Sequence, residues 1–453
     1  MSGVTSLEYV YRYPFSSQVS GSDNGLKIQL ATSQTGNRYP YFFNGRVLQP
    51  RALALVLSTL SRIVGARYYV PPAMLKRIIA ERDPVVTSGG GMLRFEGFSA
   101  CCSAYARVDL TADGYEGTVI SHGTTNVDFN APMRAVLARV RDNDRLEIAV
   151  GADELMLRTG FERTIERKVQ LPLRWLKGFV EAQAYQSAME LRFRVDRAES
   201  IRFLRSLPRS AENRSLFWVV ASGKGLRLSQ TNVGSGVPIR GLERLRLLQD
   251  LAPVVESLCI YAHPTGEASE WQLQCGPLSF NLALTAEASR GFSGEGQVLT
   301  DLAGESGSNT AKVRAALKWQ SVIDLDEIAA QAQVTGQEAR RLLGILGSRG
   351  LVGYDRHIGA YFHRELPFDI SRVEEMHPRL KNARKIIESG GVRVLRQSDN
   401  LMEAEVAGSD VEHRVRITED DARCTCQWHA KYQSSRGPCK HIIALQMLDA
   451  DGE

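Results

Sequence analysis

The sequence predicts a multi-domain α+β protein, and three observations lead to that class. Its 453 residues are enough for roughly three domains of ordinary size. Hydrophobic residues make up 43% of the chain and charged residues 24%, which is typical of globular proteins and excludes a disordered chain, a collagen or a disulfide mini-protein. Strand-like alternation and helical spacing both occur, and the composition changes abruptly at residues 291–310.

Net charge and hydropathy limit the kinds of partner and cell compartment that we expect for the protein. The net charge of +5 permits contact with nucleic acid without requiring it. Residues 1–15 lack the basic and apolar regions of a signal peptide. The longest apolar run, residues 52–60, is far short of the ~20 residues that a membrane span needs. We therefore expect a soluble, cytoplasmic protein with no membrane contact.

Residues 1–126 form the first expected region, with mixed helix and strand. Residues 41–45 predict a strand and turn, residues 50–67 an amphipathic helix, and residues 88–91 a turn between strands.

A dense stretch of aromatic and charged residues follows within this region. A thiol of Cys101 or Cys102 beside Arg94, Arg107 and Asp109 is one interpretation, because nearby cations lower a thiol's pKa. Two small cysteines in a buried strand explain the same pattern, and we favour that explanation.

Residues 127–290 are expected to form a duplicated domain. A strand, a helix, a hairpin and a further strand recur with a spacing of about seventy residues. The strand starts at Leu146 and Leu216 differ by 70, and those at Leu155 and Leu226 differ by 71.

This βαββ unit is similar to the half-domain of DNA sliding clamps, although such a duplication also builds unrelated folds. The resemblance implies a helical layer that faces DNA. Solvation of exposed helices is the alternative role for its arginines, which are Arg134, Arg139, Arg141, Arg197, Arg202 and Arg205.

Residues 291–310 predict a flexible linker. They contain five glycines, three serines and no lysine or arginine. The linker separates the large N-terminal part from two small C-terminal modules.

Residues 311–368 predict three helices and a hairpin. Asp324 and Thr335 each begin a capping pattern, with a carboxylate three residues later, ahead of an apolar helical run. Gly350 ends the last helix, and residues 351–362 alternate as a hairpin. This order resembles a winged helix-turn-helix, which implies that the second capped helix is a recognition helix.

The resemblance assigns nucleic-acid contacts to the outward side of that helix. Those residues are Gln337, Arg340, Arg341 and Arg349. Winged helices also act as protein docking modules, so both roles stay open.

A metal site is the strongest chemical signal, and it lies in the last region, residues 369–453. Cys424 and Cys426 are followed after twelve residues by Cys439 and His441. Zinc prefers thiolate and imidazole ligands in a tetrahedron, and a structural site uses all four positions. Gly437 and Pro438 provide a turn that closes the site, and residues 442–448 predict a short buried helix. We do not expect His429 to be a zinc ligand.

This CxC-x12-CxH pattern resembles the SWIM zinc finger, and the resemblance covers residues 392–448. Residues 404–409 and 411–417 read as the strand hairpin that precedes the cysteines in that family. The resemblance implies that Zn²⁺ is the cofactor and that Cys424, Cys426, Cys439 and His441 are its ligands.

The ion is expected to be structural, because four ligands leave no position for a reactive water. The surrounding cations suit phosphate, and the interleaved Trp428 and Tyr432 suit stacking on bases. A solvated face that offsets the charge of the zinc site is the alternative. The cations are Arg423, Lys431, Arg436 and Lys440.

No catalytic motif emerges. The P-loop, the hydrolase elbow, a dinucleotide fingerprint and the H-E-x-x-H pattern are all missing from the sequence, so we expect no enzyme. The leading hypothesis is a zinc-dependent adaptor that binds nucleic acid, most plausibly DNA, within a larger complex. The alternative is a protein-interaction scaffold without DNA contact. The family resemblance implies, as its partner, a MoxR-type AAA ATPase with a von Willebrand factor A protein.

Overall fold

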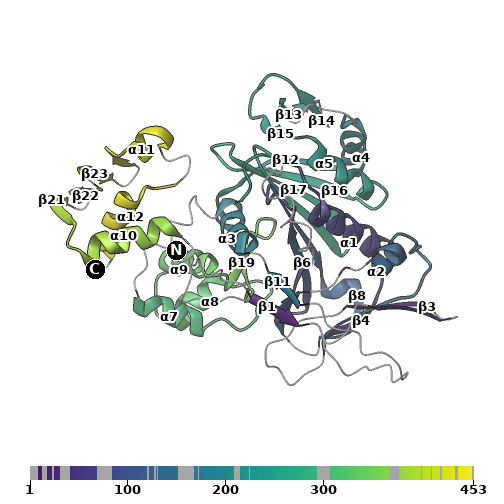
Figure 1. Cartoon of the computed structure of the whole chain (residues 1–453). Coiled ribbons are helices and arrows are strands. Elements are labelled where there is room, and N and C mark those ends of the chain that lie inside the picture. The colour runs from purple at the N-terminus through teal and green to yellow at the C-terminus, as the bar shows by residue number, and fades with distance from the viewer. Residues whose placement is uncertain are drawn as a thin grey trace.

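The computed structural model describes most of the chain. The described residues are 9–12, 18–22, 25–30, 41–68, 84–119, 122–126, 129, 131–151, 168–171, 173–208, 215–223, 225–292, 307–366, 377–398, 400–409, 411–418, 421–433 and 437–450. Figure 1 shows two large sheets on one side of the molecule and two smaller units on the other. No helix within these ranges has both the length and the apolar composition to cross a bilayer.

An eight-stranded antiparallel sheet organises the N-terminal part. The pairing of β18 with β7, from Leu278 opposite Leu110 to Leu284 opposite Ala104, joins strands from distant parts of the chain. The sheet therefore cannot be divided at residue 126. Its order is β12 (Glu190–Asp196), β16 (Ser257–Ala262), β17 (Ala268–Cys275), β18 (Leu278–Thr285), β7 (Ala104–Leu110), β6 (Met92–Phe98), β5 (Val85–Gly89) and β9 (Gly123–Asn126).

Three smaller sheets complete this part. The first has the order β2 (Gln18–Ser22), β3 (Gly25–Leu30), β10 (Leu146–Gly151), β4 (Tyr41–Val47) and β8 (Tyr115–Val119), with β10 parallel to β3 and antiparallel to β4. The second has the order β14 (Gly225–Ser229), β13 (Leu216–Ser222) and β15 (Val237–Arg240). The third pairs β1 (Tyr9–Arg12) with β11 (Lys168–Leu171).

Helices cover these sheets. α1 (Pro50–Gly65) begins with a proline in its first turn and buries an apolar stripe that includes Leu53, Leu57 and Leu60 against β6 and β7. The predicted helix 50–67 is therefore present. Also described are α2 (Ala131–Leu137), α4 (Arg197–Ser206), α5 (Glu243–Arg246), and the 3₁₀ turns η3 (Ala112–Gly114) and η4 (Leu247–Leu251).

The strand order and strand pairing agree with the expected duplication only in part. In the second half, β12, α4, the β13–β14 hairpin and β15 follow in the predicted order. In the first half α2, β10 and β11 are present, and residues 155–157 lie outside the described ranges. β10 pairs with β3 and β4, whereas β13 pairs with β14 and β15. Residues 127–290 thus share both large sheets with the preceding region.

The helix α3 (Leu173–Ala188) lies at the centre of the molecule, and the sequence pattern did not single it out. Trp175 and Phe179 pack on Phe98 of β6, with ring centroids 5.9 and 5.0 Å apart. Val180 belongs instead to the core of the C-terminal unit. α3 therefore contacts both the large sheet and the C-terminal unit.

Three helices and a hairpin follow, and we call them the helix–hairpin unit. They are α7 (Gly307–Ala315), α8 (Leu325–Ala332), α9 (Gly336–Ser348), β19 (Val352–Asp355) and β20 (Ala360–His363). Both predicted caps form: Asp324 accepts from the amides of Asp326 and Glu327, and Thr335 accepts from that of Glu338. The winged-helix assignment of this unit stays a prediction. Residues 293–306 of the expected linker lie outside the described ranges.

α9 approaches α3 very closely. A Cβ atom placed on Gly347 would lie 1.7 Å from Nε2 of Gln183, so only glycine fits there without displacing that side chain. Residues 345–348 are all buried, and Ile345 and Leu346 belong to the unit's own core.

The hairpin of this unit is joined to the large sheet through buried charges, which we call the charged junction: Arg94, Glu96, Arg107, Asp109, Asp355 and Arg364. Arg94 donates to Asp109 at 3.1 Å and to Asp355 at 3.0 Å. Arg107 reaches the same two carboxylates at 2.9 and 3.0 Å. Arg364 pairs with Glu96 at 2.5 Å. All six are at most 4% exposed.

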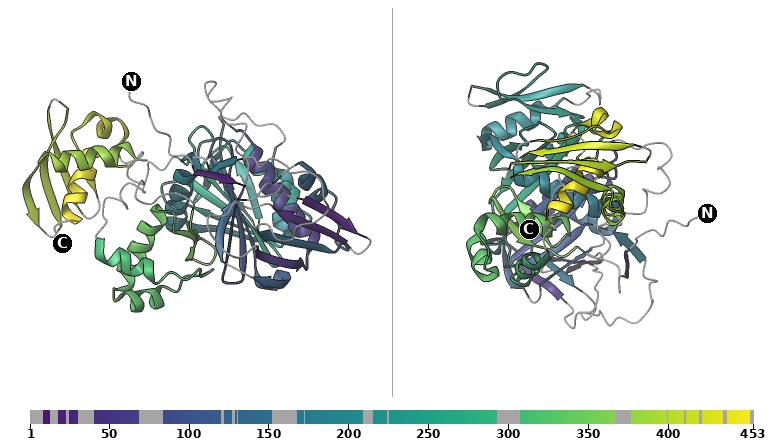
Figure 2. Two further views of the ribbon diagram at one scale, coloured as in Figure 1. Left: turned by 60° about the horizontal axis from the view of Figure 1, so that its bottom comes forward. Right: turned by 90° about the vertical axis from the view of Figure 1, so that its left-hand side faces the viewer.

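The C-terminal unit has one sheet and three helices. The order is β21 (Val392–Ser398), β22 (Leu401–Ala407), β23 (Glu412–Thr418) and β24 (Ala422–Cys424), all antiparallel. α10 (Pro378–Glu388) and α12 (Lys440–Ala450) pack together on one face, and α11 (Gln427–Tyr432) follows β24. Figure 2 shows α10 and α12 on one side of the sheet. The expected hairpin and buried helix are thus present.

Candidate metal centre

Four ligand side chains converge where β24, α11 and α12 meet. Cys424 is the last residue of β24, Cys426 is the N-cap of α11, and Cys439 and His441 lie at the start of α12. Their ligand atoms all lie within 4.8 Å of one another. The four residues are between 2% and 6% exposed, inside the core that Met402, Val415 and Ile443 help to form.

Local geometry explains how sixteen residues return to the same point. The amide of His429 donates to Sγ of Cys426 at 3.4 Å, which fixes that sulfur at the helix start. Gly437 has a φ of +72°, a left-handed conformation that lets the chain turn back towards Cys439. The carbonyl of Cys439 then accepts the amide of Ile443 as α12 begins.

The distances fit a zinc ion. Nδ1 of His441 lies 3.7 Å from Sγ of Cys424. Tetrahedral Zn–S and Zn–N bonds of ordinary length place a sulfur and a nitrogen about 3.6 Å apart. Nδ1 is therefore the ligand atom of the imidazole, and Nε2 is buried without a hydrogen-bond partner among the described residues.

The three thiols of the cluster differ in pKa. A hydrogen bond from the Cys424 thiol lowers the pKa of Cys439 to about 4. The same hydrogen bond, together with burial, raises the pKa of Cys424. Burial also raises the pKa of Cys426. A divalent cation replaces these protons, because three sulfurs packed this closely need positive charge between them.

Comparison with known families identifies this unit. Residues 413–445 match the family model of the SWIM zinc finger. These residues are a SWIM zinc finger. The four side chains of the cluster form its zinc site.

Comparison with solved structures finds weak similarities elsewhere in the chain, and no curated protein matches the sequence. Proliferating cellular nuclear antigen from Entamoeba histolytica is 9% identical, with a TM-score of 0.35 over 55% of this chain and 99% of that one. The PCNA2–PCNA3 complex from Sulfolobus tokodaii is 12% identical, with a TM-score of 0.34 over 54% and 99%. These values carry no argument about function.

The histidine left out of the predicted ligand set is not part of the cluster. His429 lies in α11 and contributes its backbone amide to Cys426. The four-residue cluster does not include its ring.

The structure places the predicted nucleic-acid contacts on two units. Gln337, Arg340 and Arg341 are exposed on the first two turns of α9, and Arg349 is its half-buried C-cap. On the finger, Arg423 is exposed on β24 and Lys431 on α11, while Lys440 is half-buried at the start of α12. Arg436 lies outside the described residues. The two sets do not form a single cluster.

A second group of cations on the finger escaped the sequence analysis. We call it the arginine face, and it lies on the side of the sheet opposite Met402 and Ala404. Register places its members together, because directly opposed residues point to the same side. Glu405 is opposite Arg393 and Arg414, Glu403 is opposite Arg396 and Arg416, and Arg416 is opposite Arg423.

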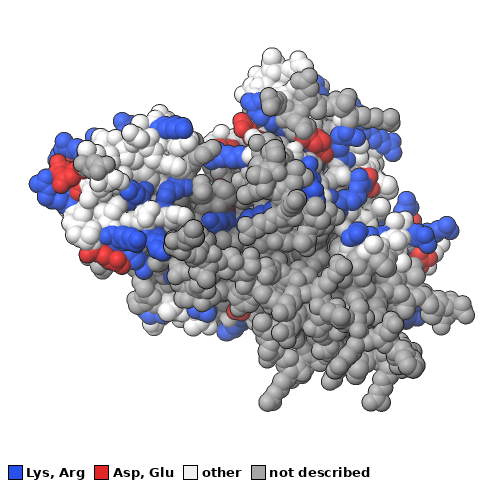
Figure 3. All heavy atoms as spheres, viewed as in Figure 1, with Lys and Arg blue, Asp and Glu red and all other residues white. Residues whose placement is uncertain are grey.

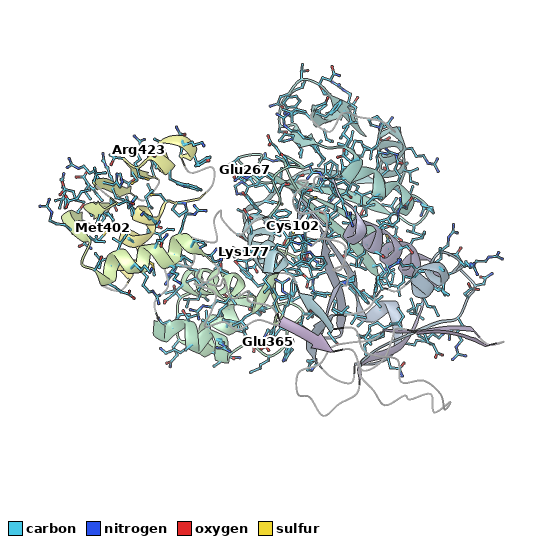
Figure 4. The ribbon with its side chains drawn as sticks, in the orientation of Figure 1. Cys102, Lys177, Glu267, Glu365, Met402 and Arg423 are labelled. Atoms are coloured by element: carbon cyan, nitrogen blue, oxygen red, sulfur yellow. The ribbon has the colours of Figure 1, made fainter. Side chains whose placement is uncertain are left out.

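The arginine face is exposed and only partly neutralised. Its members Arg393, Arg396, Arg414, Arg416 and Arg423 all have high exposure. Glu403 lies 3.6 and 3.8 Å from Arg414 and Arg416, Glu405 pairs with Arg393, and Arg423 pairs with Asp421 at 2.5 Å. Figure 3 shows Lys and Arg atoms over the outer surface of the finger, and Figure 4 labels Arg423 there. Strict alternation along residues 412–418 was the signal that could have revealed this face.

The alternative thiol site divides into two separate environments. Arg94, Arg107 and Asp109 belong to the charged junction. Sγ of Cys101 lies within hydrogen-bond distance of the hydroxyls of Ser99 and Ser103 instead, at 3.5 and 3.1 Å. Cys102 is 5% exposed and packs in the main core, whereas Cys101 is half-buried. Both lie in the turn between β6 and β7 rather than in a strand, so the favoured explanation is correct only for the burial of Cys102.

Proposed function

We propose that this protein is a zinc-dependent adaptor that binds nucleic acid, most plausibly DNA, through its SWIM zinc finger. The observation that carries the proposal is the arginine face. Five guanidinium groups lie on adjacent strands of one sheet, against three carboxylates: Glu403 and Glu405 on the same side, and Asp421 beside Arg423. Arginine is well suited to phosphate, because its planar donors bind two oxygens at once.

The carboxylates on this face oppose phosphate binding only weakly. Exposed ion pairs of this kind contribute little, about 0–1 kcal/mol each. Glu403 and Glu405 therefore compete only weakly with a phosphate chain for these guanidinium groups. Release of counterions from the nucleic acid supplies the remaining driving force.

The zinc ion supports this surface without taking part in chemistry. Four protein ligands fill a tetrahedral shell, so the ion joins β24 to α12 and leaves no position for substrate. Arg423 is next to the ligand Cys424, so the edge of the arginine face depends directly on the metal. We assign no catalytic step to the chain.

The helix–hairpin unit offers a second contact in this proposal. Gln337, Arg340 and Arg341 project from the first turns of α9, where backbone amides also favour a phosphate. Binding through two units of one chain raises affinity without new contacts at either unit.

The test compares paired substitutions on two sheets of the full-length, zinc-loaded protein. Arg414→Ala with Arg416→Ala removes two cations of the arginine face. The matched control is Arg46→Ala with Arg145→Ala, since these exposed arginines also pair with glutamates, at 3.4 and 3.2 Å, on another sheet. Fluorescence anisotropy with a labelled duplex measures the affinity at several salt concentrations.

The first pair is expected to weaken binding and to reduce the slope of log K against log salt by about 2, because each lost phosphate contact removes roughly one unit. The control pair should leave both quantities unchanged. Equal losses in both variants, or no binding by the native protein, would contradict the proposal.

A groove beside the zinc site favours the second candidate, a protein-interaction scaffold. It has a volume of about 690 Å³ and is lined by apolar and cationic side chains, among them Pro378, Val411, Trp428, Arg379 and Lys440. Val411 is 62% exposed. An acidic protein segment with an apolar anchor would suit this groove. If this candidate is correct, Val411→Asp abolishes co-purification of the partner, and the Arg414/Arg416 pair of substitutions does not.

A further inference from the structure

A second groove lies on the large N-terminal part, on the opposite side of the molecule from the finger. It runs between α1 and the segment that follows α2, and its volume is about 1000 Å³. Its floor and walls come from both segments and from η4. The lining residues are Arg51, Leu55, Ser58, Thr59, Arg62, residues 137–142 and Asp250.

One stripe of α1 forms a wall of this groove. Arg51, Leu55, Ser58 and Arg62 are spaced by three or four residues, so they lie on the same helix face. Arg51 and Arg62 are eleven residue steps apart, which span about 16 Å at 1.5 Å per residue. The groove therefore has the length of an extended ligand rather than that of a single small ion.

The charges of the groove select an anion. Four arginines line it against two aspartates. Arg51 pairs with Asp142 at 3.0 Å, and Arg62 pairs with Asp250. Arg139 and Arg141 are exposed, and neither guanidinium group forms an ion pair with a described residue. Two positive charges thus remain for a ligand.

Hydroxyl groups of α1 supply the second, independent observation. Thr59 is 1% exposed and lines the groove, yet its Oγ1 has no hydrogen-bond partner among the described residues. The buried Oγ of Ser58 is also without one in the described part of the chain. A buried hydroxyl without a partner loses its hydrogen bonds to water and gains none in return, so such groups normally meet an acceptor.

We propose that this groove binds a phosphate chain. Arg139 and Arg141 bind its charge, and the hydroxyls of Ser58 and Thr59 donate to its oxygens. The phosphates belong either to a free di- or triphosphate or to a short single strand of nucleic acid, since both present consecutive phosphates over this length. The site is separate from the finger, so it does not rest on the function proposed above.

The test uses the full-length, zinc-loaded protein and two probes: inorganic pyrophosphate, followed by thermal shift and calorimetry, and a labelled oligothymidylate, followed by anisotropy. Saturable binding of pyrophosphate identifies a free phosphate chain as the ligand. Binding of the oligonucleotide alone identifies a strand if Arg139→Ala with Arg141→Ala weakens it and Arg414→Ala with Arg416→Ala does not; the reverse pattern overturns the proposal. Saturable binding of neither probe overturns the proposal.

Two substitutions separate a binding role from a structural one. Arg139→Ala with Arg141→Ala is expected to weaken binding at least tenfold. The control, Arg205→Ala with Arg227→Ala, removes two exposed arginines that lie outside the groove and should have no effect. Equal weakening by the control overturns the proposal.

Thr59→Val gives the sharper readout, because it removes the hydroxyl and keeps the shape. It is expected to weaken binding several-fold while the free protein becomes as stable as before or more so. Unchanged affinity in this variant contradicts the assignment. The finger variant Arg414→Ala/Arg416→Ala should bind pyrophosphate as tightly as the native protein. The proposal for the groove and the proposal for the finger can therefore fail independently of each other.

Discussion

The zinc site and the charged junction both bury polar groups in an apolar core, but they do so over very different distances along the chain. The four zinc ligands lie within eighteen residues, from Cys424 to His441. In the junction, Arg364 pairs with Glu96, 268 residues away. The first arrangement stabilises one small unit, and the second joins two parts of the chain.

The two sites also differ in what neutralises their charge. The thiolates of the finger need an external cation, which a chelator can remove. The junction contains its own counter-charges: burial alone would raise the pKa of Asp355, but Arg107 and Arg94 hold it well below its ordinary value. We therefore expect that the finger can be unfolded by itself, whereas the helix–hairpin unit is locked to the large sheet.

Loss of zinc is expected to have the largest effect. A structural zinc ion in a small finger contributes about 10–16 kcal/mol of apparent binding free energy, which is also folding free energy. Cys439→Ser or a chelator should therefore unfold residues 377–450 and leave the large sheets folded. Limited proteolysis followed by mass spectrometry would show cleavage confined to the finger. Cys275→Ser, at a buried cysteine of the large sheet, is the control for thiol loss.

Breaking the charged junction is expected to have the next largest effect. Asp355→Ala leaves two buried guanidinium groups without one of their partners, which costs about 3–5 kcal/mol. Urea denaturation should show this loss in the N-terminal part while zinc content is unchanged. Asp326→Ala, at an exposed position of α8, should change stability by less than about 1 kcal/mol. Comparable losses in the two variants would mean that the junction adds no special stability to the N-terminal part.

A third prediction concerns the pH dependence of the large sheet beside the junction. Burial raises the pKa of Glu270 to about 7, although Arg107 and a hydrogen bond from Gln186 oppose the shift. The folded state therefore keeps a proton that the unfolded state loses. This contribution to stability is fully present below the ordinary carboxyl pKa and is lost as pH rises through about 7.

Glu270→Gln should remove that dependence, with an effect of a few kcal/mol at most. The variant is expected to gain stability relative to the native protein as pH rises from about 5 to about 8. Thermal unfolding across this range measures the difference, and Glu116→Gln, at an exposed carboxylate, is the control. A constant difference between variant and native protein would show that Glu270 is ionised throughout.

The smallest effect is expected on the surface of the finger. Arg393 pairs with Glu405 at an exposed position, and such pairs contribute about 0–1 kcal/mol. Arg393→Ala should hardly change stability in chemical denaturation, even though it removes a cation of the arginine face. A loss above about 2 kcal/mol would mean that this face stabilises the fold instead of serving a ligand.

Features that depend on residues close together in the chain could be predicted from the sequence. Features that depend on contacts between distant segments could not. The zinc ligands and the caps at Asp324 and Thr335 were predictable, because their geometry is set by local spacing. The arginine face needed strand register as well as alternation. The junction needed knowledge that β6, β7 and β19 meet, which no local pattern contains.

The central helix α3 illustrates a further reason for failure. Trp175, Phe179 and Val180 face the large sheet and the finger, so apolar residues occur on several sides of this helix. A helix buried on several sides has no single apolar stripe and therefore lacks the usual periodic signal. The repeat at residues 127–290 failed differently: the spacing recurs, but β10 and β13 pair with unrelated neighbours.

If the helix–hairpin unit binds a double helix as proposed, burial at the end of α9 limits how many base pairs this helix can contact. With residues 345–348 enclosed, the open part of α9 is its first six residues, which rise about 9 Å. A duplex advances about 3.4 Å per base pair, so this length covers fewer than about three pairs. Any base preference of this unit would therefore cover only about two or three base pairs. Recognition of a longer site would need DNA shape or a second protein.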